Sequence, residues 1–314
     1  MKARSRPQMW LLSFYIIYQF SGCHSEDPGT MYLGFVFDAT TASSIKAVTD
    51  AYLNSTLLIP TYRDFLQNIS STAGIDNVLN YYVKPLDPNT QAFDPEYHVT
   101  LKYCGDDQTT CEEYKKKNSQ YISKVFELHL VGYVLTNRTF GIRVNLTEAQ
   151  LPLFDNTKAD EQPSRQFEIL TTSATLDLPG IRFETLELPP SLPASNSRAH
   201  VTLGCGPGIS AVTTGPDLLQ AIEYEIDSDG SVTSVSFDNI RDPVDPQEQN
   251  MRVTQYIKEG TEDPVFVIYP SVKLIANATL LPYNNKQTNS AEVLTVFKLA
   301  PIVSIIAIAI TLQM

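Results

Sequence analysis

The chain has 314 residues, of which 43% are hydrophobic and 18% charged, so it can bury a substantial core rather than stay disordered. A net charge of −12 argues against a protein that coats nucleic acid, although a small anionic ligand needs only a local positive site. With 4 histidines, 4 cysteines and no CxxC pair, the composition favours neither a structural zinc site nor an iron–sulfur cluster. We therefore expect no metal and no cofactor.

The first 23 residues predict a secretory signal peptide. They begin with three cations, continue with an apolar run at 9–20 and end in small residues at 21–23. The apolar run is too short to span a bilayer. A buried core segment is one alternative, and a bacterial lipoprotein box ending at Cys23 is another.

Residues 24–283 alternate short strands with helices and should form one catalytic domain. The pattern predicts strands at 31–37, 97–104, 124–136, 139–146, 167–171, 182–186, 198–205, 265–269 and 273–281, and helices within 43–67, from 112 and at 216–225. Pro60 should divide 43–67 into two helices. The runs 124–136 and 139–146 flank Asn137 and Arg138 and predict a hairpin. These features indicate an α+β fold with mainly antiparallel sheets.

Two features of this domain agree with export. Five Asn-x-Ser/Thr sequons predict glycosylation at Asn54, Asn68, Asn137, Asn145 and Asn277. Removal of the signal peptide leaves Cys104, Cys111 and Cys205, so an oxidising compartment predicts one disulfide and one free thiol. Proximity favours a bridge from Cys104 to Cys111, and a bridge from Cys104 to Cys205 is the alternative.

The end of the chain predicts a GPI-attachment signal. Small residues at 289–291, with Asn289 as the expected attachment site, precede a short spacer and an uncharged apolar run at 299–312. A tail-anchored transmembrane helix is the alternative, but the run is short for a span and no basic flank follows it. We expect a stalk and attachment region at 284–291, a removed tail at 292–314, and a mature protein on the outer face of the plasma membrane.

The tetrapeptide His-Val-Thr-Leu occurs twice, at 98–101 and at 200–203, each time inside a predicted strand. Side chains alternate between the two faces of a strand, so His98 and Thr100 share one face, as do His200 and Thr202. The valines and leucines then point into the core. Two such strands side by side would bring two imidazoles and two hydroxyls together. The alternative is that both histidines are core residues in a recurring strand pattern.

This set of side chains suits the hydrolysis of a phosphodiester. A neutral imidazole can take a proton from the attacking water, while a protonated one gives its proton to the leaving alkoxide. The threonine hydroxyls can donate to the phosphate oxygens as negative charge builds on them. Histidine titrates near neutral pH, so both protonation states are available without a metal. The remaining histidines, His24 at the cleavage site and His129 in a strand-like run, lack this context.

The paired His-x-Thr motifs resemble those of the two-histidine phosphoesterases. The surrounding sequence is most similar to the catalytic domains of the 2′,3′-cyclic-nucleotide 3′-phosphodiesterase family, which includes the myelin enzyme and its fish regeneration-induced relatives. The matching segments are 32–35, 98–104, 146–151, 198–205 and 212–219. The stretch 155–187 departs from the family pattern.

The resemblance implies two lobes, each an antiparallel sheet with helices, and an active site in the groove between them. It implies hydrolysis of 2′,3′-cyclic nucleotides, or of cyclic phosphate ends of RNA, to 2′-phosphates. In these terms His98 would be the general acid, His200 the general base, and Thr100 and Thr202 the phosphate-binding residues. The positions that match substrate-binding residues of the family are Tyr32, Tyr103, Arg198 and Val212.

Two other functions stay open from the sequence. A non-enzymatic surface protein could bind ligands, RNA ends or neighbouring cells through the same groove, as the anchor and sequons would allow. RNA ligation or cyclisation could also run on the same residues. The sequence makes no prediction of the oligomeric state.

Overall fold

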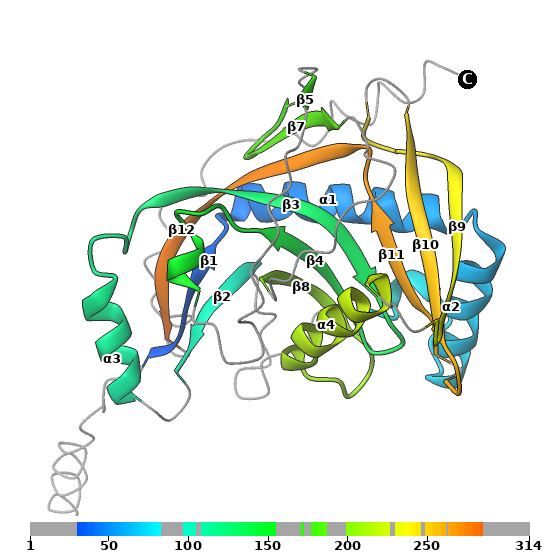
Figure 1. Ribbon diagram of the computed structural model, residues 1–314, viewed down its shortest axis with the longest axis horizontal. Helices are drawn as coiled ribbons and strands as arrows, with labels where there is room; N and C mark the ends of the chain where they lie inside the picture. The colour runs from blue at the N-terminus through cyan, green and yellow to red at the C-terminus, as the bar shows by residue number, and fades with distance from the viewer. Residues whose placement is uncertain are drawn as a thin grey trace, which may run out of the picture. The chain divides into compact units, whose positions relative to one another are not determined.

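Figure 1 shows the computed structural model, which describes residues 30–82, 97–104, 108–154, 171–172, 177–186, 199–226, 230–245, 249–261 and 263–284. These ranges belong to one compact unit, Thr30–Tyr283. The signal peptide at 1–23, Arg198, and the attachment signal from Asn289 onward lie outside the described residues and stay predictions.

Four α-helices lie in the described ranges: α1 (Ala39–Thr56), α2 (Pro60–Thr72), α3 (Gln108–Lys117) and α4 (Thr214–Glu225). Asp38 caps α1 by accepting a hydrogen bond from the backbone N–H of Thr41 at 2.7 Å. Pro60 occupies the start of α2, where its missing N–H leaves no helical hydrogen bond unmade. The predicted division of 43–67 at Pro60 is confirmed. No described helix combines the length and the apolar composition needed to cross a membrane.

Twelve strands in the described ranges form one hydrogen-bonded sheet. They are β1 (Thr30–Val36), β2 (His98–Tyr103), β3 (Val125–Leu135), β4 (Thr139–Asn145), β5 (Thr171–Thr172), β6 (Asp177–Leu178), β7 (Ile181–Leu186), β8 (His200–Cys205), β9 (Val232–Arg241), β10 (Asn250–Lys258), β11 (Val265–Tyr269) and β12 (Val272–Asn284). Their order is β5-β7-β12-β1-β2-β8-β4-β3-β11-β10-β9, with β6 on β7 and a further pairing of β12 with β3.

The pairing closes six of these strands into a ring. Because β12 pairs with both β1 and β3, the strands β12, β1, β2, β8, β4 and β3 are linked by pairings into a closed circuit. The strand pairs with a defined register run antiparallel. The expected α+β class with antiparallel pairing is confirmed.

The sheet has a hydrophobic core on each face where β3 and β11 meet. The larger core lies under α1 and α2 and joins Tyr52 of α1 to Phe266 of β11. The smaller core holds α4 on the other face, where Val134 and Val267 lie directly opposite each other. Strands buried on both faces have continuous apolar sequences, which explains the run Val265–Tyr269. Figure 1 shows α1 behind the sheet and α4 in front of it.

Candidate active site

The two His-Val-Thr-Leu strands are neighbours in the sheet. The first is on β2 and the second on β8, and they pair antiparallel with Val99 directly opposite Val201. Both valines have 0% exposure, so they form part of the core between the strands and the helices α1 and α2. The residues that flank them in sequence therefore point to the opposite face of the sheet.

Four side chains on that opposite face surround the valine pair, and each is half-buried. One step along the antiparallel register in each direction sets His98 opposite Thr202 and Thr100 opposite His200. The two histidines then lie on a diagonal, for which such strands give a spacing of roughly 7–8 Å. The motifs are related by an approximate two-fold axis through the valine pair, so the structure brings the four predicted residues onto one small surface.

Tyr32 of β1 lies against His98. The Tyr32 hydroxyl is 3.2 Å from Nδ1 of His98, and the two rings stack with their centroids 4.4 Å apart. Tyr283 of β12 also stacks on Tyr32, at 4.7 Å, and only 5% of Tyr32 is exposed. Two near-parallel rings cannot share one face of Tyr32, so both faces are covered. Tyr32 therefore contacts His98 with one ring face and Tyr283 with the other, which leaves no ring face for a nucleobase.

The N-terminal end of α4 lies against the second motif. Thr202 donates a hydrogen bond from its hydroxyl to the hydroxyl of Thr214, the first residue of α4, at 3.1 Å. A Cβ atom at Gly215 would lie 3.4 Å from Cε1 of His200, so the helix end lies against the imidazole. The backbone N–H groups of a first helical turn, with the helix dipole behind them, favour a bound anion. The position of α4 beside His200 agrees with the phosphate site expected from the sequence.

Two of the expected substrate-binding residues have exposed side chains. Tyr103 is 61% exposed and Val212 is 73% exposed, which is unusual for large apolar residues in this protein. Tyr103 ends β2 directly opposite Tyr32. Val212 lies in the 3-10 turn η4 (Ala211–Thr213), which leads into α4. Arg198, the fourth expected residue, falls just before the described residue Ala199.

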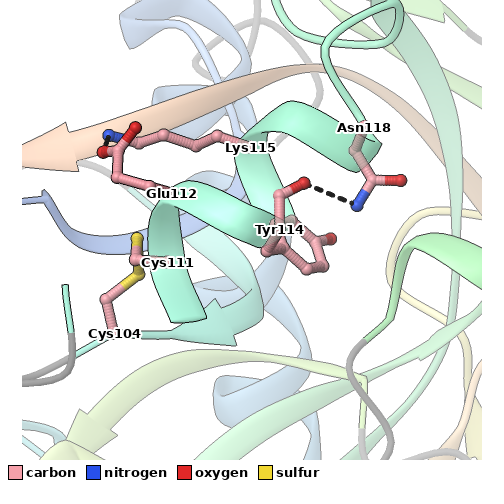
Figure 2. Close-up of a disulfide and its surroundings, with 6 residues drawn as sticks. All are labelled: Cys104, Cys111, Glu112, Tyr114, Lys115 and Asn118. Atoms are coloured by element: carbon pink, nitrogen blue, oxygen red, sulfur yellow. Dashed lines mark hydrogen bonds and ion pairs between the residues drawn. A yellow bond between two sulfur atoms is a disulfide. The ribbon is translucent and has the colours of Figure 1, made fainter. Parts of the chain in front are cut away.

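A disulfide between Cys104 and Cys111 joins the end of β2 to α3 (Figure 2). The two Cα atoms are 5.3 Å apart, and both cysteines are buried beside Leu33 in a small core of their own. This pairing is the first of the two that the sequence left open, and Cys205 is a buried free thiol. The bridge holds the strand end that carries Tyr103.

Arg143 is a buried residue beside the site that the sequence analysis did not single out. It lies on β4 directly opposite His200 and is 3% exposed. Its Nη1 donates to both carboxylate oxygens of Glu225, the last residue of α4, at 2.9 and 2.8 Å, and Tyr269 completes the group. A lone arginine inside the apolar run 140–144 is the signal that could have revealed a buried ion pair.

Two buried aspartates, Asp242 and Asp245, are part of a structural hydrogen-bond network. Asp242 accepts hydrogen bonds from the hydroxyl of Tyr52 at 2.9 Å and from the backbone N–H of Ser271 at 2.7 Å. Asp245 accepts from the hydroxyl of Ser271 at 2.9 Å. Among the described residues no three His, Cys, Asp or Glu side chains gather in a way that could hold a metal ion.

All five sequon asparagines lie within the described residues. Asn54, Asn68 and Asn277 are exposed, while Asn137 and Asn145 are half-buried. A glycan needs access to solvent, so each position has at least part of the exposure that the modification requires. Glycosylation itself stays a prediction.

Comparison with known proteins gives a family and several relatives. A model of the family "2′,3′-cyclic nucleotide 3′-phosphodiesterase (CNP or CNPase)" matches residues 30–235. The chain is 33% identical over 131 residues to a 2′,3′-cyclic-nucleotide 3′-phosphodiesterase of Pongo abelii. This matched stretch covers 41% of the present chain and 25% of the relative. The enzymes of the same name from Rattus norvegicus and Mus musculus are 33% and 32% identical over 129 residues, 40% of this chain and 24% of each relative. The matched part thus spans about a quarter of the length of these curated relatives.

Proposed function

Because the chain belongs to the 2′,3′-cyclic nucleotide 3′-phosphodiesterase family, we propose that it hydrolyses 2′,3′-cyclic nucleotides, or cyclic phosphate ends of RNA, to 2′-phosphates. The observation that carries this proposal is the antiparallel register of β2 and β8 at Val99 and Val201. That register gathers both His-x-Thr motifs on one face of the sheet. A phosphate between them would meet an acid and a base from opposite sides.

In the proposed reaction His200 is the general base and His98 the general acid. Neutral His200 takes a proton from water as the water oxygen attacks phosphorus. The bond between phosphorus and the 3′-oxygen breaks, and protonated His98 gives its proton to that oxygen. The product keeps its phosphate on the 2′-oxygen, and one proton returns from His200 to solvent and one from solvent to His98 before the next cycle. These steps use no metal.

Three groups stabilise the negative charge that grows on the phosphate. The hydroxyls of Thr100 and Thr202 donate to the non-bridging oxygens. Thr202 donates to Thr214 in the structure, at 3.1 Å. Hydroxyl groups rotate, so Thr202 can turn its proton to the phosphate and accept one from Thr214. The first turn of α4 adds the positive end of its dipole.

The base of the nucleotide is proposed to lie between exposed apolar side chains at the edge of the site. Tyr103 and Val212 are the large apolar residues with this exposure near the two motifs. An exposed tyrosine ring can stack on any base, which suits a substrate defined by its cyclic phosphate. Arg198 would add positive charge next to His200 in the sequence. Together these residues would form the groove between two lobes that the family resemblance implies.

We also propose that the protein acts on the outer face of the plasma membrane, held by a GPI anchor at Asn289. The signal patterns at both ends support this, and so does the Cys104–Cys111 disulfide, since such bonds persist in oxidising compartments. Phospholipase C specific for phosphatidylinositol should release the protein from intact cells. Retention on the cells after this treatment would contradict a GPI anchor.

Turnover of 2′,3′-cyclic AMP by the purified protein tests the proposed activity. The products 2′-AMP and 3′-AMP are separated, with and without EDTA, for the wild-type protein and for His98→Ala and His200→Ala. We expect 2′-AMP, no effect of EDTA, and a loss of about 100-fold or more in kcat for each variant. His129→Ala is the matched control, because His129 lies on β3 outside both motifs.

The outcomes separate the proposed enzyme from its main alternative. Turnover that survives in both histidine variants would contradict the proposed mechanism, and loss of activity with EDTA would contradict a metal-independent reaction. Binding of 2′-AMP without any turnover would instead favour a non-enzymatic binding protein on this fold. Formation of a new phosphodiester with an RNA 5′-end would favour ligation.

A further inference from the structure

We propose that Asp217 is a positioning residue that fixes the first turn of α4 against His200 and Thr202. The proposal rests on the proposed function, since it assigns the support for the phosphate-binding end of that site. Asp217 itself is 0% exposed and touches neither histidine motif in the structure. Its proposed role is to hold α4, whose N-terminal end contacts His200 and Thr202.

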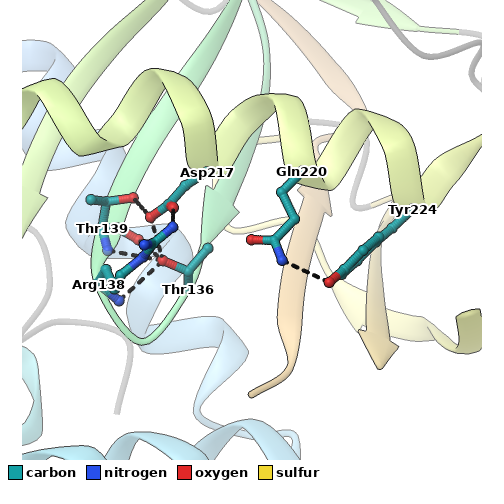
Figure 3. Close-up of polar contacts among 6 residues, drawn as sticks. All are labelled: Thr136, Arg138, Thr139, Asp217, Gln220 and Tyr224. Atoms are coloured by element: carbon teal, nitrogen blue, oxygen red, sulfur yellow. Dashed lines mark hydrogen bonds and ion pairs between the residues drawn. The ribbon is translucent and has the colours of Figure 1, made fainter. Parts of the chain in front are cut away.

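Three residues of the turn between β3 and β4 donate hydrogen bonds to the Asp217 carboxylate (Figure 3). Oδ2 of Asp217 accepts hydrogen bonds from the hydroxyls of Thr136, at 2.8 Å, and Thr139, at 2.5 Å. Arg138 donates to Oδ1 and forms an ion pair with it. The hydroxyl oxygen of Thr136 also accepts from the backbone N–H groups of Arg138, at 3.1 Å, and Thr139, at 3.0 Å, which fixes the turn itself. One buried carboxylate therefore organises the whole turn.

This anchor lies one helical turn from the contacts with the site. The first residue of α4, Thr214, accepts the hydrogen bond from Thr202, and Asp217 follows three residues later. Thr139, which holds Asp217, begins β4, and β4 pairs with β8, the strand that carries Thr202. The helix end and the motif are thus fixed to the same two strands. Gly141 of β4 lets Thr214 of α4 pack directly on the strand, since a Cβ atom at position 141 would lie 2.7 Å from Cγ2 of Thr214.

The other end of α4 is anchored to the same strand. Glu225, the last residue of the helix, pairs with the buried Arg143 of β4 at 2.8 Å. Arg143 lies directly opposite His200, so this second anchor is also next to the motif. Two buried anchors, one at each end, fix the height and the tilt of the helix on the sheet. The Asp217 anchor is the one that sets the position of the N-terminal turn.

The charge of the anchor matters for the anion that the site would bind. An uncompensated carboxylate in the first turn of α4 would satisfy the positive end of the dipole and repel a phosphate. The ion pair with Arg138 compensates the charge of Asp217. Among the described residues, the N-cap residue Thr213 makes no side-chain hydrogen bond to the first turn of α4. The field of the helix end is then directed at the surface where Thr202 and His200 lie.

The test compares Asp217→Asn, Thr139→Val and Thr139→Ser. Thr139 is part of the Asn137 sequon, so every protein in the set also carries Asn137→Gln. We expect Asp217→Asn and Thr139→Val to lower kcat for 2′,3′-cyclic AMP about ten-fold or more, because misplaced donors act on the transition state. Hydrogen exchange should become faster at the amides of Leu218 and Leu219, the first N–H groups of α4 that donate within the helix. Thr139→Ser, which keeps the hydroxyl, should retain the kcat of its parent.

Gln220→Ala is the matched control on the same helix. Gln220 donates to Tyr224 within α4, at 2.7 Å, and is not one of the residues that form either anchor (Figure 3). Its kcat and the exchange at Leu218 and Leu219 should equal those of the parent protein. A normal kcat in Asp217→Asn or in Thr139→Val would overturn the proposal, because a purely structural anchor would change stability alone. If Asp217→Asn does not fold, the pair of Thr139 variants decides.

A binding measurement separates this inference from the proposed function. If the parent protein binds 2′-AMP without hydrolysing 2′,3′-cyclic AMP, the proposed function fails, and Asp217→Asn must still weaken 2′-AMP binding about ten-fold for the inference to hold. Unchanged affinity would overturn the inference. If the parent protein neither binds 2′-AMP nor turns over the substrate, both fail.

Discussion

Tyr32 holds His98 in two ways at once, with its hydroxyl 3.2 Å from Nδ1 and its ring stacked on the imidazole at 4.4 Å. The hydroxyl can donate to Nδ1 or accept from it, so it supports the imidazole in both protonation states. Because Tyr32 contacts Nδ1, the proton transfer proposed for His98 would use Nε2. The proposed general acid must be re-protonated in each cycle, and a ring held by Tyr32 could do this without turning.

Tyr32→Phe should lower kcat while leaving the fold intact. The variant keeps the stacked ring and loses the hydrogen bond to His98, which is worth about 1.5–3 kcal/mol when one partner is charged. We expect kcat for 2′,3′-cyclic AMP to fall about 10- to 100-fold and the melting temperature to stay within about 2 °C. Tyr256→Phe, on β10 several strands away, is the matched control. A kcat equal to that of the wild-type protein would show that Tyr32 only fills space.

The ion pair of Arg143 and Glu225 should stabilise the fold only while both partners are present. Nε and Nη2 of Arg143 are buried and have no hydrogen-bond partner among the described residues, so the pair is incompletely satisfied. Arg143→Met leaves the carboxylate of Glu225 buried and should cost about 3–5 kcal/mol of unfolding free energy. Arg143→Met combined with Glu225→Leu should recover most of that loss, because no charge then stays buried.

Urea unfolding of the single and double variants measures this coupling. Glu225→Leu alone is the third corner of the cycle, and we expect it to be as destabilising as Arg143→Met. A double variant whose loss equals the sum of the two single losses would mean that the two residues contribute independently, contrary to the observed pair.

The parts of the fold that sequence reasoning predicted are those set by local chemistry. Pro60 divides two helices because proline lacks the N–H that a helix interior needs. The motif strands β2 and β8 were predicted because valine and leucine alternate with polar residues, and the burial of Val99 and Val201 at 0% follows the same alternation. Convergence of the two motifs was also predicted, but from their chemistry and the family resemblance, since no local signal determines which strands pair.

The parts that were missed depend on contacts between distant segments. Strands β9 and β10 were not predicted, since most side chains of β9 are exposed and its sequence shows no clear apolar face. The ring closes through β12, whose pairing with both β1 and β3 no local pattern specifies. Asp217 was assigned no role because its hydrogen-bond donors lie about 80 residues earlier in the chain, in the β3–β4 turn.

The stability that Asp242 contributes should be greater in mild acid than at neutral pH. Burial raises the pKa of Asp242 above its ordinary value of 3.8, against hydrogen bonds from Val244, Ser271 and Tyr52 that lower it. The folded state therefore holds this proton more tightly than the unfolded state does. The resulting contribution to stability is present below the ordinary pKa and is lost as the pH rises through the raised pKa.

Asp242→Asn isolates this contribution, because asparagine has no charge at any pH. The variant also loses hydrogen-bond acceptors for Ser271 and Tyr52, so it should be less stable than the wild-type protein at every pH. The difference in unfolding free energy should be largest near pH 4 and should shrink as the pH rises toward 7. A difference that grows with pH would mean that the pKa of Asp242 is lowered in the folded protein.

Cys205 should be unreactive in the folded protein although it is a free thiol. It is 3% exposed, and burial raises its pKa to about 11, so at pH 8 only about one molecule in a thousand carries the reactive thiolate. We expect N-ethylmaleimide at pH 8 to leave the peptide with Cys205 unlabelled in the native protein and to label it in denaturant. Cys104 and Cys111 should become labelled only after reduction, since they form the disulfide. Rapid labelling of native Cys205 would contradict its burial, and labelling of unreduced Cys111 in denaturant would point to the alternative bridge between Cys104 and Cys205.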